Sequence, residues 1–374
     1  MESTLSCRWV IVLVVLMVLL ANTPKWAQAG QYPTLDPNYT QQIYTGPLVG
    51  GPGMAWTTSG DLLTRNGSNI LEYSPTQNTT YQGTSLHGTI ATHVISGLAT
   101  SGYGMTTGLD GYIYTVTASG LQRFNPANWA APAQSLAGTV GGSGYGITTL
   151  PDGRIAYSDG TSLSSVYVYN PGTSTNSLIY SGSYLIDGIV AGPTGNIAVA
   201  GQSNSSITIL SSTGTVVNTF PTSHFPDGLA FSEGLTSSTL YSNNNDGTIS
   251  KYVLGPGYLG TPAVTDIAMG SGAYGDLASV GPDCAFYVSQ VNNFGYHGST
   301  PGVGTNWDNL TTNGDPSITR IGSATMRDGT TLCQFYSPIE GDNLPEPGSV
   351  LVLLGIAVPL LLERRFWRSV PPRM

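Results

Sequence analysis

Charged residues are scarce in this chain. Only 9% of its 374 residues are Asp, Glu, Lys or Arg, and the formal net charge is −9. Binding to nucleic acid requires clusters of Lys and Arg that neutralise phosphates, and the interval 30–344 has no such cluster. The same interval lacks any segment with the sustained hydrophobic period of an amphipathic helix. These absences argue against a nucleic-acid-binding protein and against helical domains.

Cysteine is also rare, with 3 residues in the whole chain. Cys7 lies before the N-terminal apolar run, so a processed chain would keep only Cys284 and Cys333. Two cysteines in an oxidising compartment predict one disulfide between them. A metal site built on cysteine needs more ligands of this kind nearby, and the sequence has none.

Glycine, by contrast, is abundant, with 49 residues, and much of it falls in a repeated unit. The clearest copy begins at Gly144 with GYGITTLPDGRIAYSDG. Alternating apolar and polar residues predict short strands at 145–149, 154–158 and 165–169, and a run at 177–181 completes a unit of four strands. The PDG sequence between the first two strands is typical of a tight turn.

The unit recurs six times, about every 40–50 residues. The residues that anchor the first strand of each copy are Gly53, Gly104, Gly146, Gly188, Gly228 and Asp276. A four-stranded repeat of this length is typical of a β-propeller blade, because one unit cannot bury both faces of its sheet and must stack on its neighbours. The sequence therefore predicts an all-β, six-bladed propeller of antiparallel blades over residues 41–338.

Two features concern the last blade. The segment 41–45 belongs to no repeat and could close the ring beside 317–321, although 332–336 competes for that place. An insertion, 291–316, separates the second and third strands, and loops of this length are usually functional or disordered. Its aromatic side chains either stack on sugar rings or pack on one another, and they are Phe294, Tyr296, His297 and Trp307.

Both ends of the chain have the composition of targeting segments. At the N-terminus an apolar run, 9–20, precedes Ala27 and Ala29, whose small side chains fit the pattern that signal peptidase reads. The run is shorter than the ~20 residues that span a bilayer. We therefore expect cleavage after Ala29 rather than an uncleaved membrane anchor.

The C-terminal segment has three elements in order: a Pro-Glu-Pro box, an apolar run and an arginine cluster. Their residues are Pro345, Glu346, Pro347, then 350–362, then Arg364 and Arg365. This order resembles a PEP-CTERM sorting signal, which implies processing by an exosortase-type protease. The resemblance implies an exported protein that stays transiently in the inner membrane through its C-terminal helix and then reaches the cell surface or matrix. A glycolipid-anchor tail and a plain membrane anchor are the alternatives.

The predicted organisation follows from these segments. It comprises, in order, a signal peptide (1–29), a lead-in (30–40), the propeller (41–338), a linker with the Pro-Glu-Pro box (339–348), and a membrane helix with a basic tail (349–374).

The repeats resemble NHL-type propellers, streptogramin lyases and gluconolactonase-like lactonases. The resemblance rests on the GxxxxxDGxIYxxx cadence that starts at Gly104 and on PDGLAF from Pro226. In the lactonases a divalent metal sits at the channel mouth, and the resemblance places Asp187 and Asp227 at two ligand positions. The family's first-blade glutamate, in a Glu-Gly-Pro-x-Trp pattern, is missing, because this chain has GGPGMAW from Gly50. Loss of that charged ligand weakens a hydrolytic assignment.

We call the residues at or just before the anchors, where the first strands enter the ring, the channel mouth. The candidates there are Tyr103, Tyr145, Asp187, His224, Asp227 and Asp276. A lone histidine in such a place is more often a surface residue than a ligand. The mouth combines tyrosines and carboxylates, unlike a ring of metal ligands. If Asp187 and Asp227 bind Ca²⁺ as a cofactor, we expect an affinity of about 10⁻⁴–10⁻³ M.

The remaining acidic residues have structural explanations. Asp110, Asp152 and Asp246 precede glycines between strands and are interpreted as turn residues. The sequence shows no nucleophile–base order, phosphate-binding loop or paired catalytic carboxylates. It therefore favours a monomeric propeller that acts as a binding or structural module for a polysaccharide or small molecule. A calcium-dependent lactonase- or lyase-like enzyme is the alternative.

Overall fold

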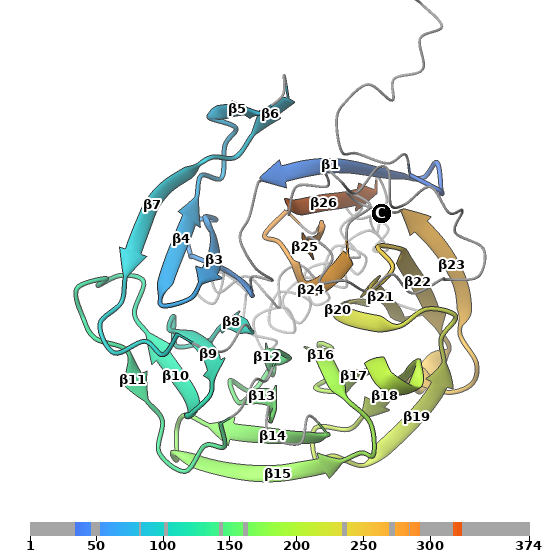
Figure 1. The fold of residues 1–374 in the computed structure, drawn as a ribbon. Helices are drawn as coiled ribbons and strands as arrows, with labels where there is room; N and C mark the ends of the chain where they lie inside the picture. Colours follow the sequence, from blue (N-terminus) through green and yellow to red (C-terminus); the bar gives the residue numbers. More distant parts are fainter. Residues whose placement is uncertain are drawn as a thin grey trace, which may run out of the picture. The chain divides into compact units, whose positions relative to one another are not determined.

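The computed structural model divides the chain into two units, Met1–Ser337 and Pro338–Met374. The structure describes residues 34–45, 53–81, 84–100, 104–141, 145–159, 164–233, 238–268, 274–283, 285–291 and 317–323, all within the first unit. Apart from short 3-10 turns, the regular elements of these residues are β-strands. Figure 1 shows the sheets of the first unit arranged around a central axis.

Six antiparallel four-stranded sheets form in the described residues, as the repeats predict. Blade 1 contains β2 (Met54–Trp56), β3 (Leu62–Asn66), β4 (Asn69–Tyr73) and β7 (Thr89–Val94). Blade 2 contains β8 (Met105–Thr107), β9 (Ile113–Thr117), β10 (Gly120–Phe124) and β11 (Gln134–Ser135). Blade 3 contains β12 (Ile147–Thr149), β13 (Ile155–Ser158), β14 (Ser165–Asn170) and β15 (Thr175–Ser181).

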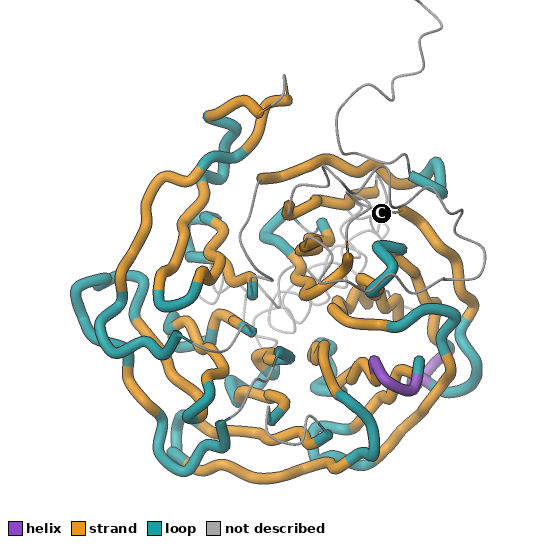
Figure 2. Tube along the Cα trace, in the orientation of Figure 1, coloured by secondary structure: helices purple, strands orange, loops and turns teal. Residues whose placement is uncertain are grey.

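The remaining three blades repeat this order. Blade 4 contains β16 (Ile186–Ala191), β17 (Ile197–Gly201), β18 (Ser206–Leu210) and β19 (Val216–Pro221). Blade 5 contains β20 (Pro226–Glu233), β21 (Ser238–Asn244), β22 (Ile249–Leu254) and β23 (Ala263–Ala268). Blade 6 contains β24 (Tyr274–Val280), β25 (Phe286–Val291), β26 (Ser317–Ser323) and β1 (Tyr39–Thr45). Strands such as β8, β12, β16 and β20 lie nearest the axis, and β15, β19 and β23 lie at the periphery (Figures 1 and 2).

The blades are held together by their apolar faces. The described residues form six hydrophobic clusters, and each cluster joins two adjacent blades, including blade 6 to blade 1. All five residues of β17, IAVAG, are buried, because this strand has a neighbouring blade on both of its faces. Burial on two faces explains why the middle strands read as apolar runs rather than as alternating sequences.

Threonine hydroxyls connect the innermost strands. Thr107 Oγ1 donates to the Trp56 carbonyl of the preceding blade at 2.7 Å, and Thr149 Oγ1 donates to the Thr107 carbonyl at 2.8 Å. One blade further, the Ala191 N–H donates to Thr148 Oγ1 at 3.1 Å. These bonds explain the Thr-Thr pairs at the ends of β8 and β12, since each hydroxyl satisfies a backbone group that the short strand leaves unpaired.

The ring closes between the start of the described chain and the third strand of blade 6. β1 pairs antiparallel with β26, with Gln41 opposite Ile321, which confirms the pairing of 41–45. The competing segment 332–336 lies outside the described residues. Tyr44 of β1 is 4% exposed and meets the rings of Trp56 and Tyr287 edge-on, so the junction of blades 6 and 1 has an aromatic core.

Two connections depart from the regular repeat. Blade 1 carries an extra hairpin, β5 (Thr79–Tyr81) and β6 (Thr84–Leu86), between its third and fourth strands, which the sequence did not predict. The predicted insertion of blade 6 does fall between the second and third strands, β25 and β26, and residues 292–316 lie outside the described part.

The structure contradicts the predicted localisation. No helix among the described residues is long and apolar enough to cross a membrane, so the inner-membrane stage and the route drawn from it are withdrawn. The segments that prompted the prediction, 9–20 and 350–362, lie outside the described residues.

Candidate functional site

The first strands enter the ring in close contact with the backbone of the next blade. A Cβ atom added to Gly188 would collide with the carbonyl oxygen of Asp227, and one added to Gly146 would collide with that of Asp187. The same clash recurs at Gly104, against the carbonyl of blade 3. A side chain at these positions would push the blades apart, so only glycine fits there.

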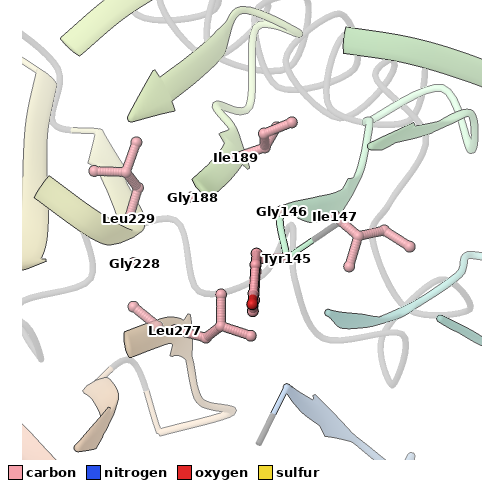
Figure 3. A pocket seen from close by; sticks show the side chains of 9 residues that line it. Tyr145, Gly146, Ile147, Gly188, Ile189, Gly228, Leu229 and Leu277 are labelled. Atoms are coloured by element: carbon pink, nitrogen blue, oxygen red, sulfur yellow. The ribbon is translucent and has the colours of Figure 1, made fainter. Parts of the chain in front are cut away.

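A recess lies on the axis, lined by blades 3, 4, 5 and 6; it opens to solvent, and its enclosed volume of about 20 Å³ is room for about one water molecule. Its lining consists of Tyr145, Gly146, Ile147, Gly188, Ile189, Gly228, Leu229, Leu277 and Ala278. Figure 3 shows the Tyr145 ring among the aliphatic side chains of the other blades. Small-molecule pockets usually enclose ~300–1,000 Å³. A ligand of ordinary size would therefore contact the channel mouth rather than enter the recess.

Asp187 and Asp227 precede two of the lining glycines but do not line the recess themselves. Asp187 is 5% exposed and Asp227 is 3% exposed. The side-chain amide of Gln202, in the 3-10 turn Gln202–Asn204, donates to Asp227 Oδ2 at 3.3 Å. Within the described part of the chain, no group of three or more His, Cys, Asp and Glu is arranged to hold a metal ion. The described residues at the mouth therefore do not form the ligand set of a lactonase-type metal centre.

His224 lies in the loop before β20 and contacts two carboxylates of its own blade. Its Nδ1 is 2.6 Å from Asp246 Oδ2, and its Nε2 is 3.3 Å from Asp266 Oδ2. These two hydrogen bonds raise the pKa of His224 from 6.5 to about 10, against the opposing effect of burial. In return, the bonds to His224 lower the pKa of Asp266. His224 is thus a half-buried cation that links a loop, a turn and an outer strand.

The hydrogen bonds continue from this histidine into blade 5. Ser250 Oγ donates to Asp266 Oδ1 at 2.8 Å, and Asn244 Nδ2 donates to Ser250 Oγ at 2.9 Å. The cluster contains Ser, His and Asp, but the serine contacts the carboxylate and not the histidine. It therefore lacks the order that activates a serine nucleophile.

Sequence reasoning missed the residues that hold the loops and blades in place. Arg65, on β3, is only 4% exposed, and its guanidinium donates to Thr115 Oγ1 at 2.7 Å and to the Val116 carbonyl at 3.2 Å in the next blade. It also donates to the carbonyl of Ala99. The sequence does not reveal the role of this arginine. Most of its acceptors are backbone oxygens, so no acidic partner residue marks the contact.

The predicted turn residues lie in turns and make local contacts. Asp152 accepts a hydrogen bond from the Arg154 N–H at 3.1 Å. Asp110 accepts one from the Tyr114 hydroxyl at 2.6 Å. Asp246 accepts one from the Thr248 N–H at 2.9 Å in addition to its contact with His224.

The other predicted site residues are not characterised structurally. Asp276 lies on β24, and its side chain is outside the described part. Residues wholly outside it are Tyr103, Phe294, Tyr296, His297, Trp307, Cys284, Cys333, Ala27, Ala29, Pro345, Glu346, Pro347, Arg364 and Arg365. The disulfide, the processing sites and the sugar-stacking loop therefore stay predictions.

Comparison with known proteins supports the fold. No protein-family model and no curated protein sequence matches the chain. An oxidoreductase of glucose dehydrogenase type from Thermus thermophilus is similar in structure, with a TM-score of 0.51 and 15% sequence identity, over 76% of this chain and 100% of that one.

Two further solved structures are similar at slightly lower scores. A streptogramin B lyase aligns with a TM-score of 0.49 and 11% identity, over 76% of this chain and 98% of that one. The aldose sugar dehydrogenase of Streptomyces coelicolor, in its PQQ-bound form, aligns with a TM-score of 0.49 and 13% identity over the same shares. At 15% identity, the similarity to the Thermus thermophilus oxidoreductase supports the propeller fold and not an activity.

Proposed function

We propose that the propeller is a non-catalytic binding module whose partner is neutral and rich in hydroxyl groups, as neutral polysaccharides are. The channel mouth carries this proposal. Its recess is lined by glycine backbone and apolar side chains, and the two carboxylates beside it are buried. An anionic substrate would need cationic partners at the mouth, and the described cation nearby, His224, is occupied by Asp246 and Asp266.

The outer surface supports the same conclusion. The outer strands β15, TNSLIYS, and β19, VVNTFP, contain no charged side chain. On β7, His93 is bound to Glu72 at 2.7 Å within blade 1. The hydroxyl and amide groups of these strands form hydrogen bonds with neutral polar partners without the desolvation cost of an ion.

Binding assays with defined polymers test the proposal. We expect a neutral glucan to bind the purified chain and a polyuronate to bind at least tenfold more weakly. Tyr145→Ala should weaken glucan binding at least tenfold, because Tyr145 presents a ring at the mouth. Tyr112→Ala is the matched control. This half-buried tyrosine does not line the recess, and its ring centre lies 4.3 Å from the Arg123 guanidinium carbon. Preferential binding of the polyuronate would overturn the proposal.

The alternative function is a calcium-dependent lactonase or lyase. A propeller of similar fold is an enzyme, which favours testing this alternative. Calorimetry with Ca²⁺ and a lactone hydrolysis assay distinguish the two. We expect no turnover and no Ca²⁺ affinity tighter than about 10⁻⁴ M, because two buried carboxylates lack a third charged ligand in the described residues. Micromolar binding with metal-dependent turnover, lost in the double variant Asp187→Asn/Asp227→Asn, would establish the enzyme.

The chain ends are a separate proposal about processing. We propose that an exosortase-type protease removes the segment after the Pro-Glu-Pro box at 345–347. Mass spectrometry of the protein purified from its native source should then find no peptide containing Phe366 or Trp367. Recovery of either peptide from the mature protein would refute the proposal.

A further inference from the structure

The loops that carry Asp187 and Asp227 are fastened at equivalent positions. Tyr184 stands three residues before Asp187, and His224 stands three residues before Asp227. Each side chain makes hydrogen bonds to two residues beyond its own loop. The position is the same in the two blades, but the residue type and its chemistry differ.

Tyr184 anchors the loop of Asp187 through hydrogen bonds between neutral groups. Its hydroxyl is 2.8 Å from Thr208 Oγ1 on β18 and 2.8 Å from the Tyr180 hydroxyl on β15. Burial raises the pKa of Tyr184 above its ordinary value of 10, so the hydroxyl keeps its proton throughout the neutral and mildly alkaline range.

His224 anchors the loop of Asp227 through ion pairs. The charged groups that face it are Asp246 from the turn between β21 and β22 and Asp266 from β23. Asp227 lies on its own segment, and Tyr252 of β22 is the next titratable group beyond the two carboxylates. An imidazolium donates from both nitrogens and satisfies both carboxylates, whereas a neutral imidazole donates from only one.

The backbone provides matched reporters of the two loops. In blade 4 the Leu185 N–H donates to Ser203 Oγ at 2.9 Å. In blade 5 the Asn245 N–H donates to the Phe225 carbonyl at 3.0 Å. Each bond joins the loop before a first strand to the connection after the second strand of the same blade.

We propose that Tyr184 and His224 are positioning residues for the loops of Asp187 and Asp227, and that the His224 loop alone is released when its imidazolium loses a proton. This deepens the proposed function, because the two loops form the mouth that would meet the ligand. At alkaline pH the loop of Asp227 in blade 5 then opens more often, while the loop of Asp187 in blade 4 stays closed.

The direction of the pH effect follows from the pKa of His224, which is about 10 in the folded chain against 6.5 ordinarily. His224 holds its proton more tightly when the loop is closed than when it is open. Its hydrogen bonds therefore stabilise the closed loop fully below pH 6.5, and this stabilisation decreases as the pH rises toward 10. Release of one proton on opening makes the opening equilibrium rise about tenfold per pH unit within that window.

Hydrogen exchange on the full chain, without any ligand, tests this directly. Protection factors, corrected for the intrinsic pH dependence of exchange, should be measured from pH 7 to pH 9. Protection at Asn245 should fall about tenfold per pH unit, whereas protection at Leu185 should not change. An equal slope in both blades, or none in blade 5, would overturn the proposal.

Two variants separate positioning from general stability. His224→Gln should lower the protection of Asn245 at pH 7 and remove its pH slope, because glutamine does not titrate. Tyr184→Phe should lower the protection of Leu185 without creating a slope. A slope at Asn245 that survives in His224→Gln would assign the titration to another group and refute the proposal. Since no ligand takes part, this outcome is independent of the polysaccharide assay.

Discussion

At the scale of single residues, the glycines near the axis fix how closely the blades approach. Gly188→Ala should lower the free energy of unfolding by on the order of 2–4 kcal/mol, because the new methyl group collides with the rigid carbonyl of Asp227. Gly172→Ala is the control, since its nearest neighbour is the Asn170 side chain at 3.3 Å, which can move. Urea unfolding compares the two, and equal losses would refute the steric explanation.

Arg65 is a buried arginine whose guanidinium donates to three backbone carbonyls. Arg65→Met should destabilise the chain by about 3 kcal/mol, because it leaves the buried oxygens of Thr115 and Val116 without their donor. Arg154→Met should change stability by less than about 0.5 kcal/mol, since the Arg154–Asp152 pair is solvent-exposed. Chemical denaturation of both variants measures the difference, and a similar effect in the two would contradict it.

The candidate site could be predicted only in part from the sequence. The equivalence of Asp187 and Asp227 was visible because each precedes an anchoring glycine. The contacts of His224 were not visible, because Asp246 and Asp266 are distant in sequence and approach it only through the folding of blade 5. Local motifs reveal where a loop begins, and the partners of a side chain depend on strand register.

At the scale of the strand, β1 closes the ring, and Tyr44 is one of its two buried tyrosines. Tyr44→Ala should lower the stability by roughly 3–5 kcal/mol, since it removes a ring that packs on Trp56, His87 and Tyr287. Tyr44→Phe should cost less than about 1 kcal/mol, because it loses only the long bond of 3.3 Å to the Ser74 carbonyl. Equal melting temperatures for the two variants would contradict this account.

The strand pattern explains both the success and the failure of the fold prediction. Turns that end in glycine recur between the first and second strands, with Asp-Gly in blades 2 and 3 and Thr-Gly in blade 4, so the period of the blades was readable. The hairpin of β5 and β6 was not predicted, because its threonines and tyrosine look like ordinary strand residues and interrupt the repeat. β11, at two residues, is too short for any alternation to show.

At the scale of the whole molecule, two histidines oppose each other in their effect on stability. Burial lowers the pKa of His87 below 6.5, so its contribution falls as the pH drops below that value. His224, with a pKa of about 10, contributes less as the pH rises above 6.5. Melting temperatures from pH 5 to pH 9.5 should therefore peak near pH 6.5. His224→Gln should flatten the alkaline side alone, and an unchanged alkaline decline in that variant would refute the assignment.

The glycine–carbonyl contacts near the axis have a consequence for the symmetry of the ring. Each blade is a wedge, and the angle of the wedge depends on how narrow its inner end is. With only a hydrogen atom at Gly104, Gly146 and Gly188, the inner ends are as narrow as a polypeptide allows. A methyl group at any of them would force two inner ends apart and widen the inner circumference. The missing methyl groups thus keep the centre of the six-bladed ring narrow on the side of blades 2 to 5.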